Sequence, residues 1–426
     1  MKEITPARFV DATVSVPGSK SITQRALIAA ALADGVSSLH GPLASEDTAH
    51  LVTALRAFGV AIEQEPQLWR VHGQGGRLTA PAEAIYLGNN GTATRFLTSV
   101  AALSSGTVTI TGDERMAQRP IGPLLRALAG WGVDIRSLRG TGCPPLEIRA
   151  QGLAGGRTVL PAGRSSQYLS SLLLVAPCAR TASELVVEGE VLSRPYVAMT
   201  CAVMAQFGVQ VQAGPAFDLF RIEPASYRAQ DYCIEGDASS ASYFWAAAAV
   251  SGGRVTVANV PEPSLQGDAA FTRLLARMGC RVMHEGRGVT VFGPPVLRGI
   301  DVDMGDWPDV VPTLAVVAAR ARGRTVIRNV AHLRIKESDR LHAMAVELGK
   351  LGVRVEELPD GLVIEGSAGG ATPLAGATIE TYNDHRIAMS FAVASLFVPG
   401  VRITGDACVA KSFPDFWSRF EEACRE

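Results

Sequence analysis

The chain has 426 residues, of which 47% are hydrophobic and 19% charged, with 43 glycines and 24 prolines. It exceeds the roughly 250–300 residues at which a single hydrophobic core stops growing, so we expect two domains. The 40 Lys and Arg residues and 41 Asp and Glu residues give a formal net charge of −1, which argues against a general nucleic-acid-binding surface. Neither a signal-peptide pattern nor a run of about 18 apolar residues occurs, so we expect a protein that does not enter a membrane and that is either cytoplasmic or a mature, processed form.

A phrase consisting of a large apolar residue, glycine and a small apolar residue recurs roughly every 73 residues. Its copies are Phe58-Gly59-Val60, Trp131-Gly132-Val133, Phe207-Gly208-Val209, Met278-Gly279-Cys280 and Leu351-Gly352-Val353. Each copy closes a helical pattern and starts a strand, and its glycine suits the left-handed conformation at a helix C-terminus. The spacing predicts repeated α/β units.

Six apolar helices, each opened by a polar cluster, lie between these phrases. The clusters are Ser19-Lys20-Ser21, Asn90-Gly91-Thr92, Ser165-Ser166-Gln167, Asp237-Ala238-Ser239, Pro308-Asp309 and Asn383-Asp384-His385. The helix bodies are apolar nearly all round, which indicates buried helices. The pattern therefore predicts six units, each with a buried helix, a strand, an amphipathic helix and a further pair of strands.

The sixth unit lacks a strand after its last helix, Phe413 to Arg425, and the N-terminal segment from Glu3 to Val16 is the candidate to supply it. This closure assigns residues 19–235 to a domain of repeats 1–3. It assigns residues 1–18 together with 236–426 to a domain of repeats 4–6. The chain would then cross twice between the domains, and we expect the active site in the cleft between them.

The N-termini of the buried helices are the expected sites for anions, because their first N–H groups lack intrahelical partners and carry the positive end of the dipole. Ser, Asn and Asp at these positions are also ordinary helix caps, so their presence alone does not distinguish an anion-binding site from a structural cap. Basic residues recur beside them, although each alone is compatible with a solvated surface charge. These residues are Lys20, Arg25, Arg95, Arg119, Arg340, Arg386 and Lys411. Together they predict a site for small ligands with several negative charges.

Asp309 and Glu337 are the best candidates for acid and base catalysis, because each lies among basic residues that stabilise its charged form. The alternative is that they form ion pairs that only orient those basic residues. Phosphate-binding loops of the GxxxxGK[ST] and GxGxxG types are absent from the sequence, as is the HExxH metal-binding pattern. No metal and no nucleotide cofactor is therefore implied.

Several segments resemble the signatures of the 5-enolpyruvylshikimate-3-phosphate synthase family, and they span the chain from the first repeat to the last. They are Pro17-Gly18-Ser19-Lys20-Ser21-Ile22-Thr23-Gln24-Arg25, Leu87-Gly88-Asn89-Asn90-Gly91-Thr92-Ala93-Thr94-Arg95, Arg119-Pro120-Ile121-Gly122, Ser165-Ser166-Gln167, Arg334-Ile335-Lys336-Glu337-Ser338-Asp339-Arg340 and Tyr382-Asn383-Asp384-His385-Arg386.

The resemblance implies a two-domain inverse α/β barrel with three βα repeats in each domain. It implies transfer of the enolpyruvyl group of phosphoenolpyruvate to the 5-hydroxyl of shikimate-3-phosphate, with release of phosphate. The reaction proceeds by addition and elimination through a tetrahedral intermediate, without metal or organic cofactor, in aromatic amino-acid biosynthesis. The family is usually monomeric.

The resemblance also implies roles for individual residues. Contacts to shikimate-3-phosphate are implied for Lys20, Ser21, Arg25, Ser165, Ser166, Gln167, Ser193, Asp309, His332 and Lys336. Contacts to phosphoenolpyruvate are implied for Lys20, Gly91, Arg119, Gln167, Arg340, Arg386 and Lys411. Asp309 is the implied base toward the 5-hydroxyl, and Glu337 and Lys20 would transfer protons at the enolpyruvyl carbon and the leaving phosphate.

Two residues depart from the family pattern. His332 stands where the pattern often has Asn, which makes the phosphate contact imidazole-mediated and sensitive to pH. Phe96 follows Arg95 where many members have Pro, a difference expected to shift the helix that carries Gly91 and so to change how tightly phosphoenolpyruvate is held. Glyphosate competes with phosphoenolpyruvate in sensitive members, and Gly91 leaves room for it, but Phe96 leaves the sensitivity of this chain open.

Two alternatives compete with this resemblance. A related transferase acting on UDP-N-acetylglucosamine typically has Lys-Asn where this chain has Lys20-Ser21, and a Cys in the loop before Arg119-Pro120. That loop, Asp113 to Pro120, contains no Cys. The other alternative is a non-catalytic anion-binding or regulatory relative, and the presence of Lys20, Asp309, Glu337 and Lys411 argues against it.

Overall fold

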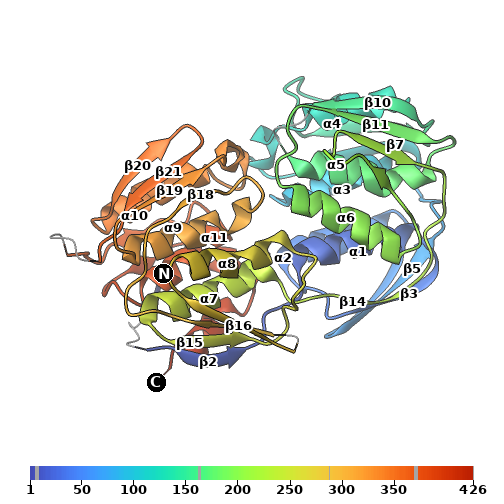
Figure 1. Ribbon diagram of the computed structural model, residues 1–426. Coiled ribbons are helices and arrows are strands. Elements are labelled where there is room, and N and C mark those ends of the chain that lie inside the picture. The colour runs from blue at the N-terminus through green and yellow to red at the C-terminus, as the bar shows by residue number, and fades with distance from the viewer. Residues whose placement is uncertain (5–8, 162–164, 287, 369–372, 426) are drawn as a thin grey trace. The chain divides into compact units, whose positions relative to one another are not determined.

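A computed structural model of the chain describes residues 1–4, 9–161, 165–286, 288–368 and 373–425. The chain divides into two compact units, one formed by Gly18–Ile234 and the other by Met1–Pro17 together with Glu235–Glu426 (Figure 1). We call them the middle unit and the terminal unit. In the described residues no helix is long and apolar enough to cross a membrane.

The middle unit contains three four-stranded sheets with one common order, in which an edge strand lies parallel to the next strand and an antiparallel pair follows. The first sheet comprises β14 (Asp231–Cys233), β3 (Asp34–His40), β5 (Leu68–Gln74) and β4 (Ala61–Glu65). The second comprises β6 (Ile85–Tyr86), β7 (Ser105–Thr111), β9 (Leu146–Gln151) and β8 (Asp134–Ser137). The third comprises β10 (Gly156–Pro161), β11 (Ser183–Glu188), β13 (Leu219–Ile222) and β12 (Gln212–Ala213).

Three buried helices of the middle unit contact one another, and they are α1 (Lys20–Leu32), α3 (Gly91–Ala101) and α5 (Ser166–Val175). Their bodies are buried on every side because other elements of the unit surround them. The partly exposed helices are α2 (Glu46–Ala57), α4 (Gly122–Gly130) and α6 (Arg194–Gln206). A hydrogen bond from Gln167 Nε2 to Thr92 Oγ1 joins the starts of α5 and α3, so their polar clusters belong to one region of the unit.

The terminal unit repeats this plan. The fourth sheet comprises β2 (Asp11–Val14), β15 (Arg254–Val257), β17 (Gly288–Phe292) and β16 (Arg281–Glu285). The fifth comprises β18 (Asp301–Asp303), β19 (Arg324–Arg328), β21 (Gly361–Glu365) and β20 (Arg354–Leu358). The sixth comprises β22 (Thr378–Ile379), β23 (Arg402–Ile403) and β1 (Lys2–Glu3). The buried, mutually contacting helices are α7 (Ala238–Ser251), α9 (Val311–Arg320) and α11 (His385–Ala394) (Figure 1). The remaining helices are α8 (Phe271–Arg277), α10 (Arg340–Lys350) and α12 (Phe416–Ala423).

The N-terminal segment serves two sheets rather than the one expected from the sequence. Only β1 joins the sixth sheet, where Lys2 and Glu3 pair antiparallel with β23. The longer β2 lies parallel to β15 in the fourth sheet, and residues 5–8 of the predicted segment lie outside the described residues. In four of the described sheets the parallel edge strand (β6, β10, β18 or β22) directly precedes the buried helix in the chain, whereas β2 and β14 are exchanged, so that β2 pairs with β15 and β14 pairs with β3.

The glycines of the repeated phrase have the predicted left-handed backbone. The φ angle is +92° at Gly59, +84° at Gly132, +86° at Gly208, +109° at Gly279 and +88° at Gly352. At such angles a side chain would be strained, so the five positions favour glycine for the same reason. All six buried helices also begin within a residue or two of the predicted polar clusters, with Asp309 in the short 3-10 helix Pro308–Val310 ahead of α9.

Candidate active site

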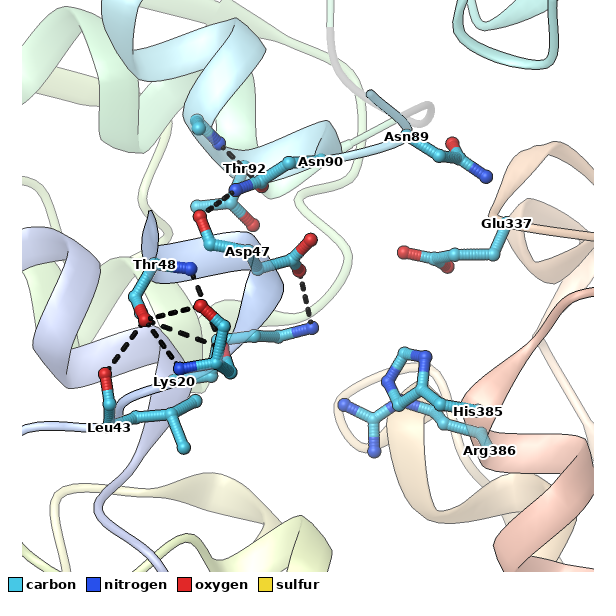
Figure 2. A network of polar contacts seen from close by, with 12 residues as sticks. Lys20, Leu43, Asp47, Thr48, Asn89, Asn90, Thr92, Glu337, His385 and Arg386 are labelled. Atoms are coloured by element: carbon cyan, nitrogen blue, oxygen red, sulfur yellow. Dashed lines mark hydrogen bonds and ion pairs between the residues drawn. The ribbon is translucent and has the colours of Figure 1, made fainter. Parts of the chain in front are cut away.

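The first buried helix of the middle unit carries Lys20 at its N-terminus. Ser19 caps α1, since its Oγ accepts a hydrogen bond from the backbone N–H of Ile22 at 3.4 Å. The Lys20 side chain is 12% exposed, and its Nζ lies 3.0 Å from Oδ2 of Asp47, which is 4% exposed (Figure 2). The helix start therefore presents a largely buried ammonium group that is held by a buried carboxylate.

Asp47 lies in the first turn of α2 and is not among the predicted site residues. Its backbone carbonyl accepts a hydrogen bond from Nδ2 of Asn90 at 2.7 Å (Figure 2). Asn90 caps α3, since its Oδ1 accepts a hydrogen bond from the backbone N–H of Ala93 at 2.9 Å. One amide therefore links the start of α3 to the residue that holds Lys20. The sequence contains no signal for this link, because acidic residues are common in the first turn of any helix.

Gly91, the first residue of α3, lies under the guanidinium of Arg119. A Cβ at residue 91 would meet Arg119 Nη2 at 2.4 Å and Cζ at 2.7 Å. Arg119 is 3% exposed, and its Nη1 donates to the backbone oxygen of Asn89 at 3.1 Å and to Asn89 Oδ1 at 2.9 Å. The absent side chain lets a cation reach a helix N-terminus, and both features favour an anion.

Arg95 fixes the loop that carries this cation. From α3 its Nη1 donates to the carbonyl of Gly91 at 3.2 Å, and its Nη2 donates to the carbonyl of Pro120 at 3.0 Å. The hydroxyl of Tyr168, from α5, donates to the same Pro120 carbonyl at 2.5 Å. The sequence marks Arg95 only as one of several cations, whereas in the structure it holds α3 to the loop before α4.

The start of α5 holds the predicted serines and glutamine. Ser165 caps the helix by accepting the N–H of Gln167 at 3.3 Å, and Ser166 is the first helical residue. Gln167 Nε2 donates to Thr92 Oγ1 at 3.1 Å, which joins the starts of α5 and α3. Ser193, the residue before α6, is 4% exposed and has a left-handed φ of +56°.

Arg25 lies one turn beyond the start of α1 and is 2% exposed. Its Nε donates to Thr200 Oγ1 at 2.7 Å, its Nη1 to the carbonyl of Ser21 at 2.9 Å and its Nη2 to Ser170 Oγ at 3.2 Å. The Cζ atom lies 5.2 Å from the ring centroid of Phe96, and burial lowers the pKa of Arg25 to about 10. Phe96 is fully buried in an unbroken α3, which therefore accommodates this departure from the family pattern.

In the terminal unit, Asp309 is held by two arginines. Its Oδ1 accepts a hydrogen bond from Arg340 Nη1 at 3.2 Å, and its Oδ2 accepts one from Arg386 Nη2 at 2.7 Å. Burial alone would raise the pKa of Asp309, but the charges of Arg386, Lys336 and Arg340 outweigh it and hold that pKa well below its ordinary value. Asp309 is therefore a carboxylate at neutral pH.

Arg340, the first residue of α10, is 1% exposed and contacts two further carboxylates. Its Nε donates to Asp384 Oδ2 at 2.8 Å, and its Nη2 donates to Glu337 Oε2 at 2.8 Å. Asp384 is fully buried, and its Oδ2 accepts a hydrogen bond from the Ser338 hydroxyl at 2.9 Å. Its Oδ1 caps α11 by accepting a hydrogen bond from the backbone N–H of Arg386 at 3.0 Å. Burial lowers the pKa of Arg340, but the carboxylates around it outweigh burial and raise that pKa.

Three predicted residues lie in or beside short 3-10 helices of the same unit. His332, in the segment Ala331–Ile335, is 5% exposed, and neither ring nitrogen has a hydrogen-bond partner among the described residues. Burial, together with the charge of Lys336, lowers the pKa of His332 to about 3. Lys411 ends the 3-10 helix Asp406–Lys411 and is 8% exposed. Within the described parts of the chain, no three His, Cys, Asp or Glu side chains gather as metal ligands.

Each unit thus gathers polar and charged side chains at the starts of its buried helices. The fold and these side chains define an α/β enzyme of six repeats that acts on anionic substrates. The family model described as EPSP synthase (3-phosphoshikimate 1-carboxyvinyltransferase) matches residues 4–420.

Named relatives agree with this match. The 3-phosphoshikimate 1-carboxyvinyltransferase of Syntrophobacter fumaroxidans is 47% identical over 423 residues, 99% of each chain. That of Methanothermobacter thermautotrophicus is 45% identical over 417 residues, 98% of this chain and 97% of the relative. A solved structure of EPSP synthase from Acinetobacter baumannii superposes with a TM-score of 0.82 at 30% identity, covering 99% of this chain and 97% of the other.

The chain belongs to the EPSP synthase family. The family's reaction is the step of the shikimate pathway that transfers the enolpyruvyl group of phosphoenolpyruvate to shikimate-3-phosphate. The family and the two-domain α/β fold class expected from the sequence are therefore confirmed.

Proposed function

We propose that this chain carries out the transfer by addition and elimination. The 5-hydroxyl of shikimate-3-phosphate adds to the substituted carbon of the enolpyruvyl group while the methylene carbon gains a proton. Loss of a methyl proton and of phosphate from the tetrahedral intermediate then restores the double bond. The observation that carries the proposal is the Asp309 carboxylate, which Arg340 and Arg386 keep ionised.

Phosphoenolpyruvate brings a phosphate and a carboxylate, so its binding requires several cations. We assign this binding to Lys20, Gly91, Arg119, Gln167, Arg340, Arg386 and Lys411. Support comes from the burial of Arg119 over Gly91 and of Arg340 among carboxylates, because buried guanidinium groups fixed by neighbours are preorganised for planar anions.

Shikimate-3-phosphate carries a phosphate, a carboxylate and hydroxyl groups. We assign its binding to Lys20, Ser21, Arg25, Ser165, Ser166, Gln167, Ser193, Asp309, His332 and Lys336. The hydroxyl and amide groups at the start of α5 suit a phosphate at a helix N-terminus, which supports this assignment.

Three residues are assigned to proton transfer. Asp309 accepts the proton of the 5-hydroxyl, since it is ionised at neutral pH and one-fifth of its side chain is exposed. Glu337, which shares Arg340 with Asp309, and Lys20 transfer protons at the methylene carbon and at the leaving phosphate. A carboxylate fixed by a neighbouring arginine keeps its geometry while its proton moves.

Phosphate release from the purified chain with both substrates tests the proposal. Asp309→Asn keeps the shape but removes the base, so kcat should fall by about 100-fold to 10,000-fold. Asp303→Asn, an exposed aspartate on β18, is the matched control and should leave kcat unchanged. Full turnover in Asp309→Asn, or no phosphate release by the unaltered chain under conditions where both substrates bind, would contradict it.

The proposal extends to the setting of the reaction. We infer a cytoplasmic monomer that is inhibited by glyphosate in competition with phosphoenolpyruvate. Gel filtration with light scattering measures the oligomeric state. A rise in the apparent KM for phosphoenolpyruvate with added glyphosate, at unchanged kcat, checks the inhibitor.

A further inference from the structure

A fully buried carboxylate, Glu347, lies on α10 two turns beyond Arg340, and seven residues place both on one face of the helix. Its oxygens accept hydrogen bonds from Tyr382 OH at 2.8 Å and from the backbone N–H of Glu380 at 3.1 Å. They also pair with Lys350 Nζ at 2.7 and 2.8 Å. The carboxylate therefore joins α10 to the segment that connects β22 to α11.

That segment has an uncommon backbone. Tyr382 and Asn383 both have a φ of +53°, a left-handed conformation that non-glycine residues rarely adopt. Two such residues in succession persist only when the surrounding structure holds them. Asp384, which caps α11, follows directly, and two positions further lies Arg386, whose Nη2 donates to Asp309.

We propose that Glu347 is a positioning residue for Arg386, acting through Tyr382 and the backbone of Glu380. Arg340 holds the end of this segment through Asp384, and Glu347 holds its start. With both ends fixed to α10, the left-handed turn directs Arg386 toward Asp309. The inference rests on the proposed function, which gives Arg386 its role toward phosphoenolpyruvate.

The competing explanation is that Glu347 only stabilises α10 by its ion pair with Lys350, three residues away on the same helix. The Lys350 side chain is 38% exposed, and Lys350→Met removes the ion pair while leaving the hydrogen bonds from Glu380 and Tyr382. Tyr382→Phe removes one of those hydrogen bonds and leaves the ion pair. The two substitutions separate the explanations.

The experiment compares Glu347→Gln, Tyr382→Phe and Lys350→Met in the full chain by phosphate release. We expect kcat/KM for phosphoenolpyruvate to fall about tenfold in Tyr382→Phe and roughly 10-fold to 100-fold in Glu347→Gln, as for a lost hydrogen bond to a charged group. Lys350→Met should stay within twofold. The double variant Glu347→Gln/Tyr382→Phe should lose little more than Glu347→Gln alone, because both act through one contact.

Hydrogen exchange of the peptide covering residues 380–388 provides a readout of the turn that does not depend on turnover. Exchange should be faster in Glu347→Gln and Tyr382→Phe, and unchanged in Lys350→Met. Unchanged exchange, or faster exchange with wild-type kcat/KM, overturns the proposal. Equal kinetic losses in all three variants also overturn it, in favour of a purely structural role. A failure of the proposed function appears separately, as wild-type turnover in Arg386→Ala.

Discussion

The guanidinium of Arg119 occupies the space that a side chain at residue 91 would need, with Nη2 2.4 Å from the position of a Cβ. Arg119 is itself held by Asn89, which precedes the cap of the same helix. The missing side chain of Gly91 and the placement of the cation are therefore one feature, and neither can change without the other.

Gly91→Ala should displace Arg119 and weaken phosphoenolpyruvate binding. We expect the KM for phosphoenolpyruvate to rise about tenfold or more, the equivalent of one misplaced charged contact. Steady-state phosphate release at saturating shikimate-3-phosphate measures it. Gly349→Ala is the control, because a Cβ there meets nothing within 4 Å. A KM within twofold of the wild type in Gly91→Ala would show that Arg119 does not bind this substrate.

Lys20→Met should abolish turnover and also lower stability. Asp47 is 4% exposed, so removal of its cation leaves a buried carboxylate, at a cost of about 3 kcal/mol. Adding Asp47→Asn removes that charge and should restore most of the stability without restoring turnover. Urea unfolding and phosphate release on the three variants separate the two effects. Recovery of turnover in the double variant would mean that Lys20 acts only through the fold.

Local rules explain how much of this site was predictable from the sequence. Ser19 and Ser165 are caps that precede wholly apolar helix bodies, so the sequence indicates where the buried helices begin and which cations lie there. The contact between Glu347 and Tyr382 joins residues that share no repeat or period. Such contacts depend on how α10 packs against the segment before α11, which composition and spacing do not encode.

The pairing of the strand Asp11–Val14 is a second feature that the sequence alone does not determine. The segment Asp11–Val14 has the alternating pattern of a strand, but that pattern fits an edge position in either of two sheets. Its parallel pairing with β15 follows from the closure of three sheets in each unit, which is a property of the whole unit. The sequence therefore predicts a strand in this segment correctly, but the predicted partner, the sixth unit, is wrong for β2.

Asp384→Asn should destabilise the terminal unit strongly. Asp384 and Arg340 are 0% and 1% exposed, and the substitution leaves a buried guanidinium with one carboxylate fewer, which we expect to cost about 3–5 kcal/mol. Asp301→Asn is the matched control, because Asp301 makes the same paired contact to Arg328 on the surface, where the side chains are 59% and 54% exposed. Its urea midpoint should hardly move. Equal shifts in the two variants would mean that burial is not what makes the Asp384 contact important.

His332→Asn should reduce the loss of unfolding free energy that occurs as the pH falls below 6.5. The unfolded chain takes up a proton on His332 near pH 6.5, whereas burial delays this in the folded chain to a pKa of about 3. The stability held by neutral His332 is therefore complete above pH 6.5 and is lost as the pH falls from 6.5 toward 3, by about 2 kcal/mol at pH 5. Urea unfolding at pH 8 and pH 5 measures the difference, which should shrink by that amount in His332→Asn. His284→Asn, at an exposed histidine, should leave it as in the wild type. If the two variants show the same pH dependence, His332 does not remain neutral inside the fold, and its ring must already have an anionic partner before shikimate-3-phosphate binds.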